Sequence, residues 1–116
     1  MTKYELLFYD LPNGDVPCLD FLKSLNTKLK AKMVRAMDVL SENGTNLREP
    51  YSKPIEDGIF ELRAQVGTDT SRIMYFFYDR GNIILTNGFV KKTNKTPRQE
   101  IEKAKKYRAE YLSRSK

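Results

Sequence analysis

The sequence predicts an α+β fold in which two helices pack on a small sheet and a third helix follows the sheet. Three apolar runs between residues 59 and 90 are separated by short joints rich in Gly, Asp, Ser and Thr, as in an antiparallel meander. An apolar stripe with helical spacing precedes these runs. A proline-marked helix start follows them.

The first half of the chain predicts a strand and two helices. The strand covers residues 4–9 and ends at the turn-forming sequence Pro12-Asn13-Gly14. A short helix over residues 16–24 follows, with Asp15 as its predicted cap. Asn26 or Thr27 caps the second helix, which Asn43-Gly44 ends. Its apolar stripe consists of Leu29, Met33, Ala36, Met37 and Leu40.

Residues 45–58 have no hydrophobic period and contain two prolines, which predicts an extended connector with Arg48, Tyr51 and Lys53 as its possible functional groups. The terminal helix is signalled by Thr96 as N-cap, Pro97 at the first helical position and a capping-box Gln99.

Cations accompany each run of the predicted meander. In the first run, alternation puts Arg63 and Glu61 on the more polar face. The second run is apolar on both faces, as in a covered strand, and Arg72 is its one cation. The third run leads into Lys91 and Lys92. Neighbouring strands lie about 4.8 Å apart, so these cations can converge into an anion site.

Length and composition indicate a single domain over residues 1–116. The chain has one cysteine and no histidine, so we expect no disulfide framework and no Cys/His zinc site. No carboxylate cluster with metal-ligand spacing is visible either, and we expect no metal and no cofactor. No stretch approaches the roughly 18 apolar residues of a membrane span. We therefore expect a soluble, cytoplasmic protein.

The net charge of +6 is concentrated near the C-terminus. Residues 1–89 hold 11 basic and 12 acidic side chains, whereas residues 90–116 hold 10 basic and 3 acidic ones. This asymmetry fits a polyanionic partner such as nucleic acid or an acidic protein segment. A well-solvated terminal helix would show the same pattern.

Three segments carry a family resemblance: GIFELR (58–63), RIMYFF (72–77) and GFVKKTNKTP (88–97). In this order and spacing they resemble the RelE/ParE superfamily of bacterial toxins, and within it the phage-derived Gp49-like, or HigB-type, branch. The resemblance spans nearly the whole chain. It implies a small RelE-like fold with an N-terminal strand, two helices, an antiparallel sheet completed by a three-strand meander and a C-terminal helix.

The same resemblance implies a ribosome-dependent messenger-RNA endonuclease that inhibits translation. A cognate antitoxin, of helix-turn-helix type, would neutralise it in a toxin–antitoxin hetero-oligomer. The motif arginines of the family fall on Arg63 and Arg72, its basic pair falls on Lys91 and Lys92, and Phe89 is similar to the motif aromatic. Many relatives use a histidine or tyrosine near the end of the sheet as a catalytic aid, and this chain has no histidine.

The chemistry of metal-independent RNA cleavage indicates the same arginines and lysines as the family resemblance. RNA cleavage without metal uses the 2′-OH of the substrate, so the protein must stabilise a dianionic phosphorane and move protons. Arg63 and Arg72 suit the first task, because a guanidinium is always charged and can donate two hydrogen bonds to phosphate. Lys91 or Lys92 is the candidate for proton transfer. Glu61 is either a base or the ion-pair partner of an arginine.

Further side chains are candidate RNA contacts, by base stacking or by charge. They are Tyr51, Lys53, Phe89, Lys95, Arg98, Lys103 and Lys106. Two alternative functions remain open: a toxin of the same fold without RNA chemistry, such as a gyrase-directed ParE-like protein, and a plain RNA-binding module. The basic pair before the terminal helix favours the endonuclease.

Overall fold

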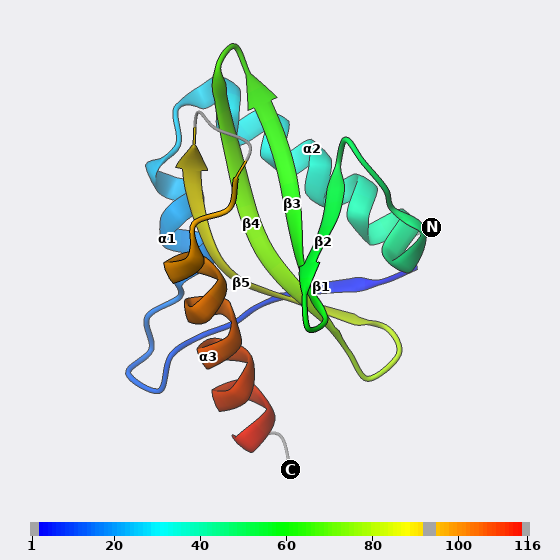
Figure 1. Cartoon of the computed structure of the whole chain (residues 1–116), viewed down its shortest axis with the longest axis vertical. Coiled ribbons are helices and arrows are strands. Elements are labelled where there is room, and N and C mark those ends of the chain that lie inside the picture. Colours follow the sequence, from blue (N-terminus) through cyan, green and yellow to red (C-terminus); the bar gives the residue numbers. More distant parts are fainter. Residues whose placement is uncertain (1–2, 92–94, 115–116) are drawn as a thin grey trace.

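The computed structural model describes residues 3–91 and 95–114, which form a five-stranded sheet with helices on both faces (Figure 1). The strands are β1 (Glu5–Phe8), β2 (Ser52–Glu56), β3 (Ile59–Val66), β4 (Asp69–Tyr78) and β5 (Asn82–Lys91). The helices are α1 (Pro17–Ser24), α2 (Thr27–Asn43) and α3 (Arg98–Arg114), with a 3-10 turn, Gly44–Asn46, after α2. The predicted α+β class and the RelE-like order of elements are confirmed.

The strands lie in the order β1-β5-β4-β3-β2. β3, β4 and β5 are the predicted antiparallel meander. β1 pairs with β5 in parallel, with Leu6 opposite Ile83, so the sheet is mixed rather than wholly antiparallel. A parallel neighbour requires a long crossover, and the intervening helices and strands supply it.

The connector predicted over residues 45–58 contains an additional strand, β2, which pairs with β3 at the edge of the sheet. Pro54 lies inside it, and the register shifts between Pro54 and Glu56. An edge strand tolerates proline because one side of its backbone needs no ladder partner. The predicted extended connector is therefore a paired strand over Ser52–Glu56, which the sequence pattern did not predict.

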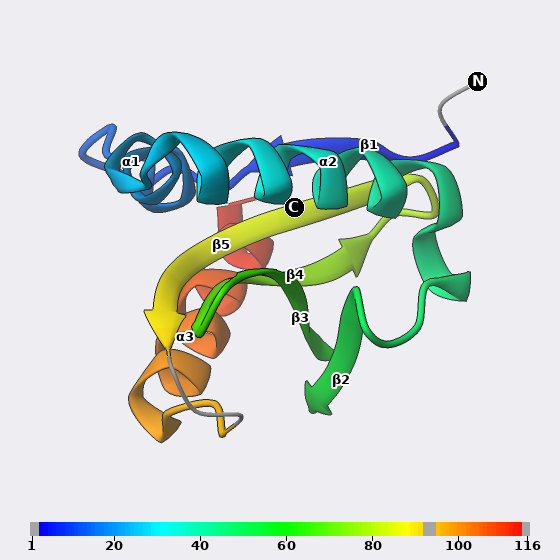
Figure 2. The ribbon, with the colours of Figure 1, turned by 90° about the horizontal axis from the view of Figure 1, so that it is seen from above.

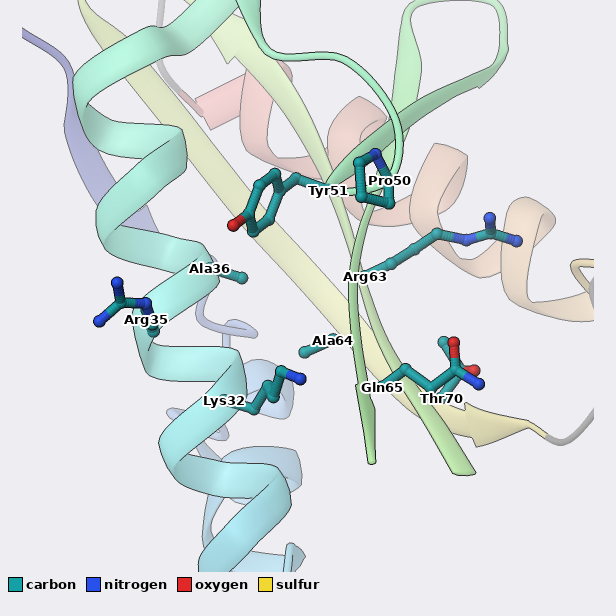
Figure 3. A pocket seen from close by; sticks show the side chains of 9 residues that line it. All are labelled: Lys32, Arg35, Ala36, Pro50, Tyr51, Arg63, Ala64, Gln65 and Thr70. Carbon is teal, nitrogen blue, oxygen red and sulfur yellow. The ribbon is translucent and has the colours of Figure 1, made fainter. Parts of the chain in front are cut away.

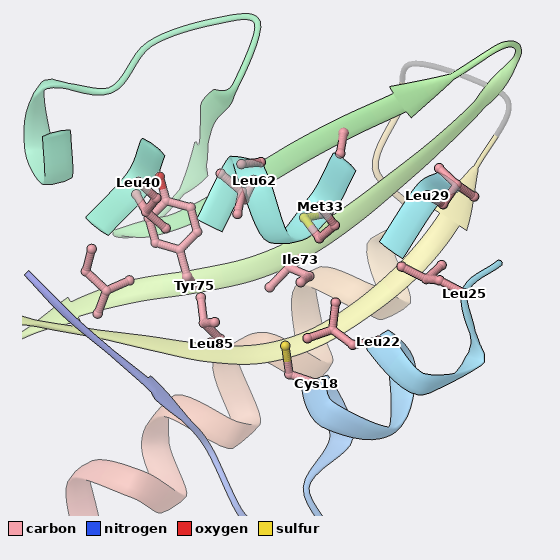
Figure 4. Packing of buried hydrophobic residues seen from close by; sticks show 13 residues of the cluster. Cys18, Leu22, Leu25, Leu29, Met33, Leu40, Leu62, Ile73, Tyr75 and Leu85 are labelled. Carbon is pink, nitrogen blue, oxygen red and sulfur yellow. The ribbon is translucent and has the colours of Figure 1, made fainter. Parts of the chain in front are cut away.

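Helices lie on opposite faces of the sheet, as Figure 2 shows from above, and each face has its own hydrophobic core. α1 and α2 cover one face, where the stripe residues Leu29, Met33 and Leu40 meet Leu62 and Ile73 (Figure 4). α3 covers the other face, where Ile101 and Ala104 pack with Tyr9, Ile59, Met74, Phe76 and Ile84. The sheet is thus the middle of three layers.

The helix caps agree only in part with the sequence. The Asn26 side chain accepts a hydrogen bond from the Leu29 N–H at 2.9 Å, as an N-cap does. The predicted cap Asp15 is wrong, because Val16 occupies the N-cap position of α1. Thr96 does not occupy the predicted cap position either, because α3 begins at Arg98 and the Pro97 carbonyl accepts its first backbone hydrogen bonds. The Thr96 hydroxyl donates to Glu61 of β3. Its position instead ties the start of α3 to the sheet.

Among the described residues, no helix is both long and apolar enough to cross a membrane.

Candidate functional site

Three rows of paired side chains form a polar area on the face of the sheet that α3 covers. Paired residues on neighbouring strands point to the same face, so each row can be followed from strand to strand. The central row is Arg63, Arg72 and Phe89. The row on one side of it is Gln65, Thr70 and Lys91, and the row on the other side is Lys53, Glu61 and Met74. The predicted convergence of Arg63, Arg72 and Lys91 on one face is therefore present.

Phe89 and Lys91 reach this face because β5 contains a β-bulge. Between the regular pairs on either side, Thr86 and Asn87 of β5 lie opposite Met74 alone. Without the extra residue, every later position of β5 would change face, and Phe89 and Lys91 would point toward α1 and α2. The bulge thus decides which side chains meet the arginines.

Hydrogen bonds fix the bulge in place. The Thr86 hydroxyl donates to the Met74 carbonyl at 3.1 Å. The Asn87 side-chain amide donates to the carbonyl and to the carboxylate of Glu100, at 3.2 and 3.0 Å. Both bulge residues are buried, so these bonds satisfy polar groups that water does not reach. The bulge and the first turn of α3 are therefore held together.

A buried ion pair lies at the centre of the polar area. Glu61 and Arg72 are both 0% exposed, and Arg72 Nη1 lies 3.5 Å from Glu61 Oε2. Arg63 Nε donates to Glu61 Oε1 at 2.9 Å, and the Thr96 hydroxyl donates to Oε2 at 2.5 Å. One carboxylate is therefore contacted by three donor side chains, which offsets the high cost of burying charge.

Arg72 also lies against an aromatic ring, with its guanidinium carbon 5.9 Å from the centre of the Phe89 ring. Burial lowers the pKa of Arg72 from its ordinary value, and the Glu61 carboxylate opposes that effect. The pKa of an arginine is ordinarily so high that the side chain stays charged in proteins. Arg72 is thus a permanent buried cation held by Glu61 and Phe89.

Three cations that are more exposed than Arg72 border this buried pair. The Arg63 side chain is 16% exposed, and Lys53 and Lys91 are half-buried. In the described part of the chain, no carboxylate forms an ion pair with Lys53 or Lys91. We call Lys53, Arg63 and Lys91 the basic rim. A phosphate approaching this face would meet the basic rim before it met Arg72.

For Glu61 the structure favours one of the two expected roles, whereas Arg72 differs from the substrate contact expected of it. Glu61 is enclosed and accepts from three donors, so its position fits the ion-pair alternative better than the general base. Arg72 is 0% exposed, so in this conformation it supports Glu61 rather than contacting a substrate. Sequence alone could not show this, because the residue pattern does not tell how deeply a cation on a central strand is buried.

The other predicted RNA contacts are dispersed. Tyr51 lines a separate pocket beside α2. Lys95 is exposed just before Thr96, and Lys103 and Lys106 are exposed on α3, which leads away from the polar area (Figure 1). Lys92 lies outside the described residues.

Several cations of α3 are paired with acids at the end of β2. Glu56 accepts hydrogen bonds from Arg98 at 2.6 Å and from Lys105 at 2.5 Å. These bonds, chiefly that of Arg98, hold the pKa of Glu56 at about 2. Arg108 pairs with Asp57 at 3.0 Å. The positive charge of α3 is thus partly neutralised by ion pairs within the fold. This weakens the hypothesis that α3 is a free RNA-binding surface.

The described residues contain no group of three His, Cys, Asp or Glu side chains arranged to hold a metal ion.

A model of one protein family matches residues 20–109, from α1 to the last turns of α3. Its description is phage derived protein Gp49-like (DUF891). The chain belongs to this family. The Gp49-like family is associated with the toxins of toxin–antitoxin systems, and such a toxin implies an antitoxin partner in general. A search of curated proteins found no match to the chain. The matched span includes β2, β3, β4 and β5 and hence every residue of the basic rim.

Proposed function

We propose that this Gp49-like protein is a HigB-type toxin of the RelE/ParE superfamily and acts as a ribosome-dependent messenger-RNA endonuclease. The observation that carries the proposal is the basic rim. Lys53, Arg63 and Lys91 converge on one sheet face around the buried Glu61–Arg72 pair. Cations fixed on rigid strands are suited to a phosphate whose charge grows during reaction.

In the proposed reaction, the ribose 2′-oxygen attacks the adjacent phosphorus and gives its proton to a base. A phosphorane with additional negative charge forms, and the 5′-oxygen then leaves and takes up a proton. The products carry a 2′,3′-cyclic phosphate and a 5′-hydroxyl. No metal is needed, because the nucleophile belongs to the substrate and cations of the protein stabilise the phosphorane.

Arg63 is the proposed phosphorane contact, since it is the partly exposed guanidinium of the central row. Lys91, with Lys92, is proposed for proton transfer, and Lys53 for phosphate binding. Arg72 is proposed as a positioning residue: it holds Glu61, which in turn orients the Arg63 guanidinium. Ribosome and messenger RNA are the proposed partners besides the antitoxin.

Primer extension on a message translated in a purified system tests the proposal. We expect new RNA ends within codons at the ribosomal A site when the protein is added, and none when ribosomes are omitted. Arg63→Ala should remove the ends, whereas Lys30→Ala, which removes an exposed cation of α2, should leave them. Intact messages would argue against the endonuclease. A supercoiling assay on purified gyrase then distinguishes the ParE-like alternative from a plain RNA-binding module.

A further inference from the structure

A second feature lies at the edge of β3, between that strand and α2. A pocket of about 300 Å³ opens there, at the lower end of the size range of ligand pockets (Figure 3). Its lining comprises Lys32, Arg35, Ala36, Pro50, Tyr51, Arg63, Ala64, Gln65 and Thr70. Nothing in the cleavage chemistry above uses the α2 side of this pocket.

The charged side chains of the lining are all basic. Lys32 and Arg35 come from the exposed side of α2, and Lys28 continues the same stripe one turn earlier. No described side chain forms an ion pair or hydrogen bond with Lys32 or Arg35. Arg63 points away from α2 (Figure 3), toward its partner Glu61 on the other face. The pocket therefore has its own cations, distinct from the basic rim.

The rest of the lining suits a flat ring. Tyr51 is 40% exposed at the mouth of the pocket, and its ring points toward α2 in Figure 3. Ala36 and Ala64 face each other below it, and their small side chains leave space between helix and strand. Exposed tyrosines beside cationic grooves are common stacking platforms for nucleobases.

The backbone edge of β3 adds hydrogen-bonding groups. β2 pairs with β3 only as far as Ser52 opposite Leu62, and the Arg63 N–H then donates to the Tyr51 carbonyl at 2.8 Å. Backbone groups alternate in direction along an antiparallel strand, so the N–H and C=O of Gln65 point the same way as the Arg63 N–H. A donor and an acceptor are thereby directed at the pocket, as needed to read the edge of a base.

We propose that this pocket binds one nucleotide of RNA, with its base stacked on Tyr51 and its phosphate held by Lys32 and Arg35. The assignment rests on the proposed RNA chemistry and extends it, because it adds a nucleotide subsite beside the strand that bears Arg63. An acidic peptide strand pairing with β3 is the competing occupant. The free edge beyond Arg63 extends only to Val66, which is short for strand addition, whereas one stacked base fills the space.

Titration of the isotope-labelled protein with nucleoside 5′-monophosphates, followed by amide NMR spectra, tests the assignment without ribosomes. We expect shifts at Lys32, Ala36, Ala64 and Gln65. Tyr51→Ala and the double variant Lys32→Gln/Arg35→Gln should each weaken binding about tenfold or more. Tyr51→Phe should retain binding, because it keeps the ring. Lys30→Gln is the matched control, since it removes a cation half a turn away on α2, and the spectra themselves report whether each variant is folded.

Three outcomes would overturn the assignment. Equal shifts with inorganic phosphate or ribose 5-phosphate would make the pocket a simple anion site. Stronger shifts of the same amides with a glutamate-rich peptide would make it a protein-docking surface. Amide shifts only at residues outside the lining would show that the nucleotide does not bind in this pocket. Primer extension on ribosomes is a separate measurement, so nucleotide binding can fail while cleavage succeeds, and cleavage can fail while nucleotide binding succeeds.

Discussion

The guanidinium of Arg72 and the ring of Phe89 lie together on the α3 face of the sheet, although they arrive there by different routes. Arg72 follows the regular alternation of β4. Phe89 reaches this face only after the bulge at Thr86 and Asn87 has shifted β5 by one residue. The geometry of the candidate site therefore depends on a local irregularity of the backbone as well as on the identity of its cations.

The glycine beside the bulge gives a direct test of this packing. A Cβ at Gly88 would lie 2.3 Å from a ring carbon of Phe21 in α1, which is too close for any real contact. Gly88→Ala should therefore destabilise the protein by about 1–3 kcal/mol in urea denaturation. Gly81→Ala is the control, because nothing lies within 4 Å of a Cβ there. Equal stability of the two variants would show that Phe21 and α1 can shift to make room for the methyl group without loss of stability.

Removal of the buried carboxylate should be far more damaging. Glu61→Gln leaves the 0% exposed Arg72 guanidinium without its carboxylate, and breaking a buried pair costs about 3–5 kcal/mol. Urea denaturation measures the loss. Glu102→Gln breaks an ion pair of an exposed helix face, so it should change stability by less than about 1 kcal/mol. Comparable losses in both variants would contradict the importance of the buried pair.

Substitutions of Arg63 and Arg72, the two arginines of the central row, should have different effects on the single-turnover cleavage rate on the ribosome. Arg63→Lys keeps the charge but loses the fork of the guanidinium, so a phosphorane contact predicts a rate loss of roughly 10²-fold with ribosome binding nearly intact. Arg72→Lys should instead fold less stably and cleave at close to the normal rate once folded, since Arg72 is enclosed and a lysine keeps the charge that holds Glu61. The reverse pattern would return the catalytic assignment to Arg72.

Glu56 predicts a pH effect with a definite sign. Its pKa is lowered from 4.5 to about 2 by hydrogen bonds from Arg98 and Lys105, so its contribution to stability is complete above the ordinary value. That contribution is lost as the pH falls from about 4.5 to 2. In Arg98→Gln, carboxyl NMR titration should show the Glu56 pKa moving up toward its ordinary value. Lys106→Gln removes the same charge from a neighbouring position of α3 and should leave that pKa unchanged.

Most elements of the fold could be predicted because their signals are local. The stripe of Leu29, Met33 and Leu40 predicted α2, and the cap at Asn26 is confirmed. β2 was missed because an edge strand containing Pro54 has neither alternation nor a full ladder, and its pairing with β3 is not encoded nearby. The Thr96 hydroxyl was misassigned for the same reason, since its partner Glu61 is remote in sequence.

The candidate site could be predicted only as a set of residues. Alternation along β3 correctly placed Glu61 and Arg63 on one face. The bulge could not be located by alternation, although Gly88 inside an apolar strand is a signal for one. The apolar run predicted that the strand of Arg72 is covered, but whether the Arg72 side chain itself is enclosed depends on where α3 and Thr96 come to lie. The α2 pocket likewise depends on a gap between elements that are distant in sequence.

The tight turn between β3 and β4 has a consequence for the order of folding. Glu61 and Arg72 lie on the two arms of a single hairpin, in which Val66 pairs with Asp69 next to the turn. A hairpin of this kind forms from local contacts, ahead of pairings between distant segments. We therefore expect the carboxylate and the guanidinium to meet while water still surrounds both. When α3 later covers that face, a neutral pair is dehydrated rather than two separate charges.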